Sequence, residues 1–141
     1  MYLIDTNVLS EIRKNQKANK GVRDFFESIA NETSDEQRLF ISVVTIGELR
    51  RGIELIKHRG DTPQADRLEK WLRVILDEYR DNILEIDDDT AQLWGKLRVP
   101  HPGNAIDKFI AATALIHGLT VVTRNNKDFI KTGVPVLNPF V

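Results

Sequence analysis

The chain has 141 residues, 41% of them hydrophobic and 29% charged, a composition typical of one soluble globular domain covering residues 1–141. It contains no cysteine, which excludes disulfide frameworks, thiolate zinc sites and a cysteine nucleophile. The formal net charge of −1 provides no overall positive field to attract nucleic acid. Any interaction with nucleic acid must therefore come from a local site.

The opening residues do not resemble a secretory signal, because Asp5 and Glu11 interrupt the first apolar run. No stretch approaches the roughly 20 apolar residues that a membrane-spanning helix needs. We therefore expect a cytoplasmic protein with no membrane partner.

The first predicted elements are a strand and two helices. Residues 2–4 form a short apolar run that predicts a buried strand, and the capping residues 5–7 predict a helix start. A second helix is predicted from about 20 to 31, where apolar residues recur at helical spacing. The polar stretch 31–37 predicts a loop.

A second strand, a helical hairpin and a third strand follow. Residues 39–41 predict the strand, and Ser42 leads into a long helix. The segment 60–63 interrupts that helix, and its proline suits the first turn of the next one. Residues 83–86 predict the third strand.

The last part of the chain predicts two more helices, over 87–98 and 104–117, and two strands, over 119–123 and 134–137. The proline in the final strand favours an edge position, because it cannot donate to the ladder. Strands that alternate with helices indicate a mainly parallel sheet covered on both faces. In such sheets functional residues gather beyond the carboxyl ends of the strands.

Acidic residues stand at several of these predicted strand ends and helix starts. Asp5 follows the first strand, Glu48 lies early in the long helix, and Asp107 lies in the first turn of the helix 104–117. Asp128 and Asn125 follow the strand 119–123. Each has an ordinary alternative: a helix cap for Asp5, a solvent-facing side chain for Glu48, and loop solvation for the last two.

Asp107 could likewise complement the helix dipole or complete a cap with Asn104. Taken together, however, these acids come from separate segments that a parallel sheet would bring to one edge. Clustered carboxylates repel one another, so they must bind a cation or protons. Oxygen ligands without cysteine or paired histidines favour Mg²⁺ or Mn²⁺ over zinc.

The chain resembles a known family. Four motifs in order, spread over nearly the whole chain, are similar to those of PIN domains, and in particular to VapC-type ribonuclease toxins of bacterial toxin–antitoxin pairs. The motifs are Ile4-Asp5-Thr6-Asn7-Val8, Thr45-Ile46-Gly47-Glu48-Leu49, Asp107-Lys108-Phe109-Ile110-Ala111-Ala112-Thr113-Ala114 and Val122-Thr123-Arg124-Asn125.

The resemblance implies a three-layer α/β/α fold with a mostly parallel five-stranded sheet. It implies hydrolysis of RNA phosphodiester bonds, with transfer RNA the expected substrate, by a water that Mg²⁺ or Mn²⁺ activates. Asp5, Glu48 and Asp107 match the catalytic, metal-binding acids. The expected products end in 5′-phosphate and 3′-hydroxyl, because water rather than the RNA 2′-hydroxyl attacks.

The supporting residues follow from the same motifs. Thr6 matches the hydroxyl residue after the first acid, and Thr123 matches the threonine of the last motif. Many relatives place a fourth acid two residues after that threonine, where this chain has Asn125. Asn125 could still orient a water or a carboxylate, and Asp128 is the acid that could substitute as a fourth catalytic residue.

Arg124, Arg50 and Arg51 are the candidate RNA-binding residues, since Arg124 follows a strand end and the other two share the helix of Glu48. The resemblance also implies a homodimer and a cognate antitoxin that inserts a basic side chain toward the acids. The helical turn at 60–63 is a candidate contact for the antitoxin.

Other charged and aromatic groups favour structural roles. Glu85 and the run 87–89 are interpreted as a strand end and a helix N-terminus. The three histidines show no ligand spacing, and Trp71 and Trp94 occupy apolar helical positions.

Three alternatives to a ribonuclease remain. A degenerate PIN domain could bind RNA or a partner without cleavage, and Asn125 favours it. A phosphatase would use Asp5 as a nucleophile, but the usual second aspartate is replaced by Asn7. A relative that cuts DNA is the third.

Overall fold

A five-stranded sheet runs through the centre of the computed structural model, which describes residues 1–32 and 38–141. The strand order is β3-β2-β1-β4-β5, and every neighbouring pair is parallel. The strands are β1 (Tyr2–Ile4), β2 (Leu39–Ser42), β3 (Ile83–Leu84), β4 (Thr120–Val122) and β5 (Val136–Leu137). The predicted five-stranded sheet is confirmed, and its pairing is wholly parallel. Residues 33–37 of the predicted loop lie outside the described residues.

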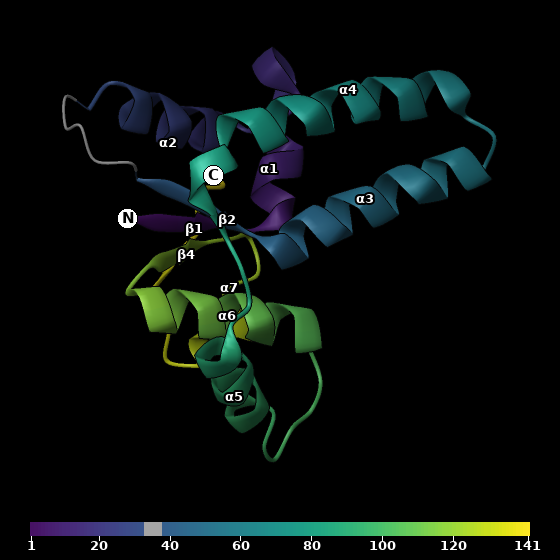
Figure 1. Ribbon diagram of the computed structural model, residues 1–141. Coiled ribbons are helices and arrows are strands. Elements are labelled where there is room, and N and C mark those ends of the chain that lie inside the picture. The colour runs from purple at the N-terminus through teal and green to yellow at the C-terminus, as the bar shows by residue number, and fades with distance from the viewer. Residues whose placement is uncertain (33–37) are drawn as a thin grey trace.

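Helices cover both faces of this sheet, as Figure 1 shows. One face packs against α1 (Thr6–Ile12), α2 (Lys20–Ala30), α3 (Val43–His58) and α4 (Thr62–Glu78). The other face packs against α5 (Asp88–Leu97), α6 (Ala105–His117) and α7 (Asn126–Ile130). The short 3₁₀ turns η1 (Asn15–Lys17) and η2 (Arg80–Asn82) follow α1 and α4. The predicted three-layer α/β/α architecture is therefore confirmed.

Successive residues of the central strands face opposite cores. Leu3 and Val121 pack with α6 and α7, whereas Ile4 and Val122 pack with the helices of the other face. All four are fully buried. Strands covered on both faces need continuous apolar runs, which explains why the sequence of β1 and β4 shows no polar alternation.

The direction in which successive strands are added across the sheet reverses at β1. From β1 it proceeds to β2 and β3 on one side, and later returns to β4 and β5 on the other side. The backbone N–H of Asp5 donates to the Val122 carbonyl (3.0 Å), so the carboxyl ends of β1 and β4 lie side by side. This is the topological switch point at which ligands bind in open parallel sheets.

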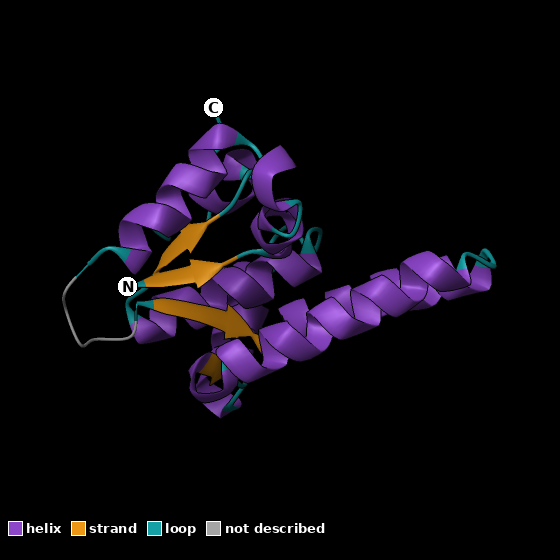
Figure 2. Cartoon of the chain, turned by 90° about the horizontal axis from the view of Figure 1, so that it is seen from above, coloured by secondary structure: helices purple, strands orange, loops and turns teal. Residues whose placement is uncertain are grey.

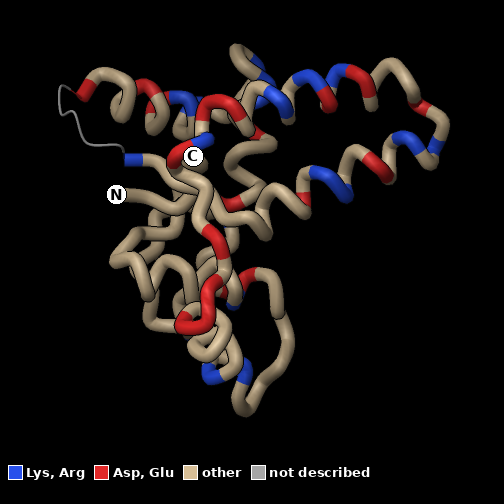
Figure 3. Tube along the Cα trace, in the orientation of Figure 1, with Lys and Arg blue, Asp and Glu red and all other residues tan. Residues whose placement is uncertain are grey.

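The helical hairpin of α3 and α4 projects away from the sheet, as Figure 2 shows. Gly60 (φ +85°) lies at its turn, and Asp61 caps α4 by accepting from the Gln64 N–H. Basic and acidic residues alternate along both helices (Figure 3). Glu69 of α4 accepts hydrogen bonds from Arg50 (2.5 and 3.1 Å) and Lys57 (3.1 Å) of α3, and these ion pairs tie the projecting parts together.

Three elements differ from the expectations. The last strand, predicted over 134–137, begins only at Val136. The strand predicted over 83–86 ends at Leu84, and the short helix α7 forms where only strand-end polar residues were expected. No helix in the described ranges combines the length and the apolar character required to span a membrane.

Candidate active site

Asp5 lies at the carboxyl end of β1 and caps α1. Its Oδ1 accepts from the Thr6 backbone N–H (2.8 Å), and its Oδ2 accepts from the Thr123 hydroxyl (2.8 Å). The side chain of Asn7 donates a third, longer bond to Oδ2 (3.3 Å). The residue is only 3% exposed. Asp5 is therefore both the helix cap and a buried carboxylate at the switch point.

Burial raises the pKa of Asp5 above its usual value of 3.8, and the negative charge of Glu48 acts in the same direction. The bonds from Thr123, Thr6 and Asn7 oppose that rise. Since a carboxylate has about four lone-pair positions, three donors leave room for about one further contact.

Glu48 comes from the second turn of α3, which begins where β2 ends. Its Oε1 accepts a 2.7 Å hydrogen bond from the Thr6 hydroxyl. Because Thr6 directly follows Asp5, this bond brings the carboxylate of α3 to the end of β1. The Glu48 side chain is half-buried and not simply solvated.

Thr123 and Asn7 link the ends of β4 and β1. The Thr123 hydroxyl, fully buried, accepts from the Asn125 backbone N–H (3.0 Å) while it donates to Asp5. The Asn7 amide donates to the Thr123 hydroxyl (3.3 Å), and its carbonyl accepts from the Arg124 N–H (3.1 Å). From the sequence, Asn7 was expected to help start a helix and was part of the first motif, but no role in the site was predicted for it. Its position two residues after a strand-end acid was the signal for this linking role.

Asp107 enters the site from the first turn of α6 and is half-buried. Within the described residues no hydrogen-bond donor reaches its carboxylate. Burial, followed by the negative charges of Asp5, Asp128 and Glu48, raises the pKa of Asp107 to about 6. Asp107 is therefore close to three other acids that arrive from β1, α3 and α7.

The proposed cap of α6 by Asn104 is wrong, because the Asn104 side chain does not bond to the helix start. Asn104 adopts the left-handed conformation (φ 54°), and its amide instead donates to Asp128 (3.3 Å). That bond links α6 to α7 and holds Asp128 beside Asp107. The side chain of Asn125 makes no hydrogen bond in the described part of the chain and is exposed.

Asp5, Glu48, Asp107 and Asp128 form what we call the acidic cluster. No group of three or more of the described Asp, Glu and His residues is arranged closely enough to hold an ion directly. Magnesium, however, keeps several waters and commonly takes only one or two protein carboxylates. The all-oxygen donor set and the raised pKa of Asp107 fit such an ion, since a cation would offset the repulsion among the acids.

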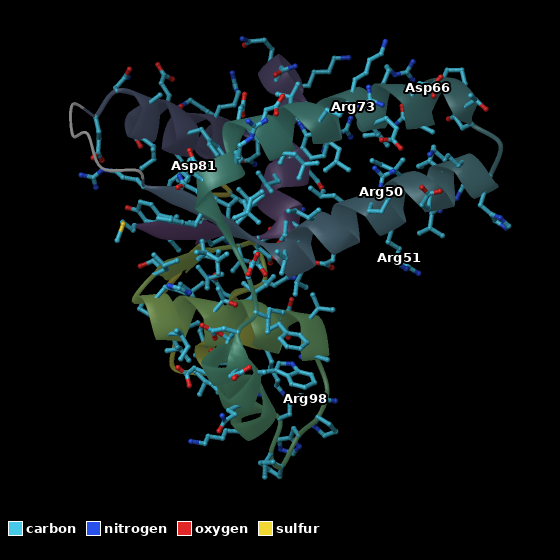
Figure 4. All side chains as sticks on the ribbon, viewed as in Figure 1. Arg50, Arg51, Asp66, Arg73, Asp81 and Arg98 are labelled. Carbon is cyan, nitrogen blue, oxygen red and sulfur yellow. The ribbon has the colours of Figure 1, made fainter. Side chains whose placement is uncertain are left out.

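The basic residues singled out from the sequence lie in different surroundings. Figure 4 shows Arg50 between the two hairpin helices, where it pairs with Glu69 and Glu54, and Arg51 away from α4. The guanidinium of Arg124 lies 4.9 Å from the centre of the Phe140 ring. Arg124 is joined to the site through its backbone N–H, which donates to Asn7, whereas its guanidinium lies against Phe140.

The groups given structural roles do lie outside the cluster. Asp87 caps α5 through bonds from the Thr90 N–H and hydroxyl (2.9 and 2.8 Å). Trp94 stacks on Phe109 with ring centres 4.1 Å apart, and Trp71 packs against the core of α3 and α4.

Comparisons with known proteins identify the family to which the chain belongs. Residues 2–135 match the model of the PIN domain family. The chain belongs to the PIN domain family.

Curated relatives cover almost the entire chain. Plasmid stability protein StbB of Pseudomonas syringae pv. tomato is 35% identical, and toxin FitB of Neisseria gonorrhoeae is 33% identical; each match covers 99% of both chains. VapC ribonuclease Y4jK of Sinorhizobium fredii is 31% identical over 99% of this chain and 98% of its own.

Solved structures share the fold. The crystal structure of FitAcB from Neisseria gonorrhoeae superposes with a TM-score of 0.83 at 31% identity, covering 99% of this chain and 98% of that one. A toxin–antitoxin complex from Klebsiella pneumoniae matches with a TM-score of 0.69 at 27% identity, covering 99% and 98%.

Proposed function

We propose that this protein is a metal-dependent endoribonuclease that acts as the toxin of a toxin–antitoxin pair in the cytoplasm. The observation that carries the proposal is the acidic cluster, in which β1, α3, α6 and α7 each contribute one carboxylate at the switch point of the sheet. Relatives over the full chain are named as a toxin and as a VapC ribonuclease.

Asp5, Glu48 and Asp107 would hold Mg²⁺, partly through waters, and Mn²⁺ would substitute. When bound, the ion would offset phosphate charge, activate a water and stabilise the leaving oxygen. Asp128 is the nearest replacement for the family's fourth acid, because Asn104 holds it beside Asp107.

The neighbouring polar residues position these acids. Thr6 orients Glu48 through its hydroxyl, and Thr123 with Asn7 fixes the Asp5 carboxylate from the β4 side. Such supporting partners hold ligand geometry, and their loss commonly costs about 10–100-fold in activity or metal affinity. Thr6, Thr123 and Asn7 would thus act through the carboxylates that they hold.

Cleavage would be a hydrolysis of the RNA backbone, with transfer RNA the expected substrate class. The oxygen of a water forms a new bond to phosphorus as the bond from phosphorus to the 3′ oxygen breaks. One product then carries a 5′-phosphate and the other a 3′-hydroxyl.

The partner would be a small antitoxin that covers the site, and the active form a homodimer. A groove of about 250 Å³ runs between α1, α3 and α4 and is lined by residues that include Thr6, Arg13, Glu48 and Trp71. It connects the projecting hairpin with the acidic cluster, which makes it the natural path for an inhibiting segment. A basic side chain at its end would pair with the carboxylates.

The test is the chemistry of the product ends. We expect RNA incubated with the purified protein and Mg²⁺ to yield 5′-phosphate and 3′-hydroxyl ends, and a chelator to stop cleavage. Fragments ending in 2′,3′-cyclic phosphate would contradict the mechanism. RNA binding without any cleavage in Mg²⁺ or Mn²⁺ would identify the degenerate binding module instead.

A further inference from the structure

A pocket of about 280 Å³ borders the acidic cluster and shares one residue with it, Asp128. Its walls are the connection between α5 and α6, the first turn of α6, and α7 with the residues that follow it. Figure 1 shows this connection looping away from the sheet between α5 and α6. The volume has room for several waters, each of which occupies roughly 30 Å³ in the liquid.

Three lysines line this pocket: Lys108 from α6, and Lys127 and Lys131 from α7 and its end. Asp128 is the single acid among the lining residues, and its carboxylate already accepts from Asn104. The lining therefore carries excess positive charge. On a chain of net charge −1, such a local concentration of cations favours an anionic ligand.

These lysines are not neutralised by other side chains. In the described ranges none of the three forms an ion pair, whereas Arg50 and Lys57 of the hairpin are both paired with Glu69. Lys108 donates to the backbone carbonyl of His101, which holds the wall of the pocket and leaves the ammonium charge uncompensated. Lys127 and Lys131 are exposed and free to meet a ligand.

The pocket lies directly beside the residues proposed to carry out the reaction. Lys108 directly follows Asp107 in α6, and Asp128 belongs both to the pocket wall and to the acidic cluster. An acidic cluster repels the phosphates of RNA, so affinity must come from cations outside it. Arg50 does not line this pocket, and its guanidinium pairs with Glu69, whereas the three lysines of the pocket have no such partner in the described ranges.

We propose that Lys108, Lys127 and Lys131 form a binding site for a phosphodiester group of the RNA strand, adjacent to the phosphate that is cleaved. This inference rests on the proposed function, since it assigns the substrate-binding part of the same site. The lysines position the strand and supply affinity, and they take no part in bond cleavage.

The test is RNA binding without metal, which does not depend on cleavage. The probe is a fluorescent single-stranded RNA oligonucleotide, titrated by anisotropy in a chelator at several salt concentrations. The variant is Lys127→Ala with Lys131→Ala, both exposed positions. The matched control is Lys17→Ala with Lys70→Ala, which removes the same charge from exposed positions on η1 and α4.

We expect the pocket variant to bind about tenfold more weakly at low salt. The slope of log K against log salt should fall in magnitude by about 1.4, because each phosphate contact on a single strand contributes about 0.7. The control variant should match the wild type. In Mg²⁺ the pocket variant should show a raised KM and an unchanged kcat.

Equal slopes for the two variants would overturn the proposal, as would a wild type that does not bind RNA. If the lysine substitutions abolished binding of inorganic phosphate but left RNA binding unchanged, the pocket would bind a free anion. That result would also overturn the proposal. Wild-type RNA binding without cleavage would reject the proposed function while leaving the pocket assignment supported.

Discussion

The carboxylate of Asp5 serves the helix and the site at once. It caps α1 through the Thr6 N–H and receives the Thr123 hydroxyl from the neighbouring strand. The helix cap that the sequence suggested as an ordinary alternative is therefore present. The two roles do not compete, since one oxygen meets the helix and the other faces β4.

Residue types and spacing were enough to single out the acids. What the sequence could not provide was their support: the contribution of Asn7 and the partner of Asn104 depend on distances between segments more than 20 residues apart. The prediction that Arg50 binds RNA was made without knowledge of its ion pair with Glu69, which lies 19 residues away in the next helix. The roles of Arg50, Arg51 and Arg124 in RNA binding remain predictions.

The raised pKa of Asp107 predicts a stability cost of the acidic cluster in the absence of metal. Burial, together with the neighbouring acids, raises the pKa to about 6 from 3.8, so the folded chain favours the protonated carboxyl. The protonated Asp107 carboxyl is therefore compatible with the fold, and its contribution to stability is fully present below pH 3.8. This contribution is lost as the pH rises through about 6 and the carboxyl ionises in the folded chain. We expect Asp107→Asn to raise the Tm at pH 7.5 in a chelator and to have little effect near pH 4.

Asp66→Asn is the matched control, since Asp66 is exposed on α4. It should change the Tm by the same small amount at both pH values. An Asp107→Asn variant with a Tm below that of the wild type at pH 7.5 would show that the acids do not repel one another as described.

At the scale of elements, long periodic helices and apolar strands were predictable and short elements were not. The helix α7 has five residues and a single fully buried side chain, Phe129, so it has no periodic signal. The strand β3 has two residues, which explains why its end was misplaced. Both elements depend on contacts with the rest of the sheet layer, which no local pattern contains.

The C-terminal segment crosses α2 at a glycine. A Cβ at Gly21 would lie 2.0 Å from the Pro139 carbonyl oxygen, and Asn19 binds both the N–H and the carbonyl of Val141 (3.1 and 2.9 Å). We expect Gly21→Ala to destabilise the fold by about 1–3 kcal/mol in urea unfolding, because the backbone of α2 or of the C-terminal segment must move to make room for the added Cβ.

Gly95→Ala provides the comparison, because Gly95 also lies within a helix and nothing stands within 4 Å of an added Cβ. Helix propensity predicts that this change stabilises the fold by about 0.5–1 kcal/mol. Equal effects of the two substitutions would contradict the close contact at Gly21.

In the hairpin of α3 and α4, Glu69 should contribute to the stability of the fold in a pH-dependent way. Hydrogen bonds from Arg50, then from Lys57, lower the pKa of Glu69 from 4.5 to about 2. Its stabilising effect is present above pH 4.5 and is lost as the pH falls toward about 2. We expect Glu69→Gln to lower the urea midpoint at pH 6, with a gap to the wild type that narrows by pH 3. A gap independent of pH would contradict the ion-pair account.

At the scale of the whole molecule, the alternation of strands and helices predicted the parallel sheet and the edge at which the acids meet. The strand order was not predictable, because the direction of each crossover depends on packing against two separate cores. That order matters, since it places the ends of β1 and β4 side by side and gathers acids from four segments.

The most direct test of the central claim is RNA cleavage in Mg²⁺ by three proteins: the wild type, Asp107→Asn and Asp66→Asn. All three should fold, as thermal unfolding will show. We expect the wild type and Asp66→Asn to cleave equally, and Asp107→Asn to lose more than the roughly 10–100-fold that a merely supporting residue would cost. Near wild-type cleavage by Asp107→Asn would contradict the assignment of the acidic cluster as the active site.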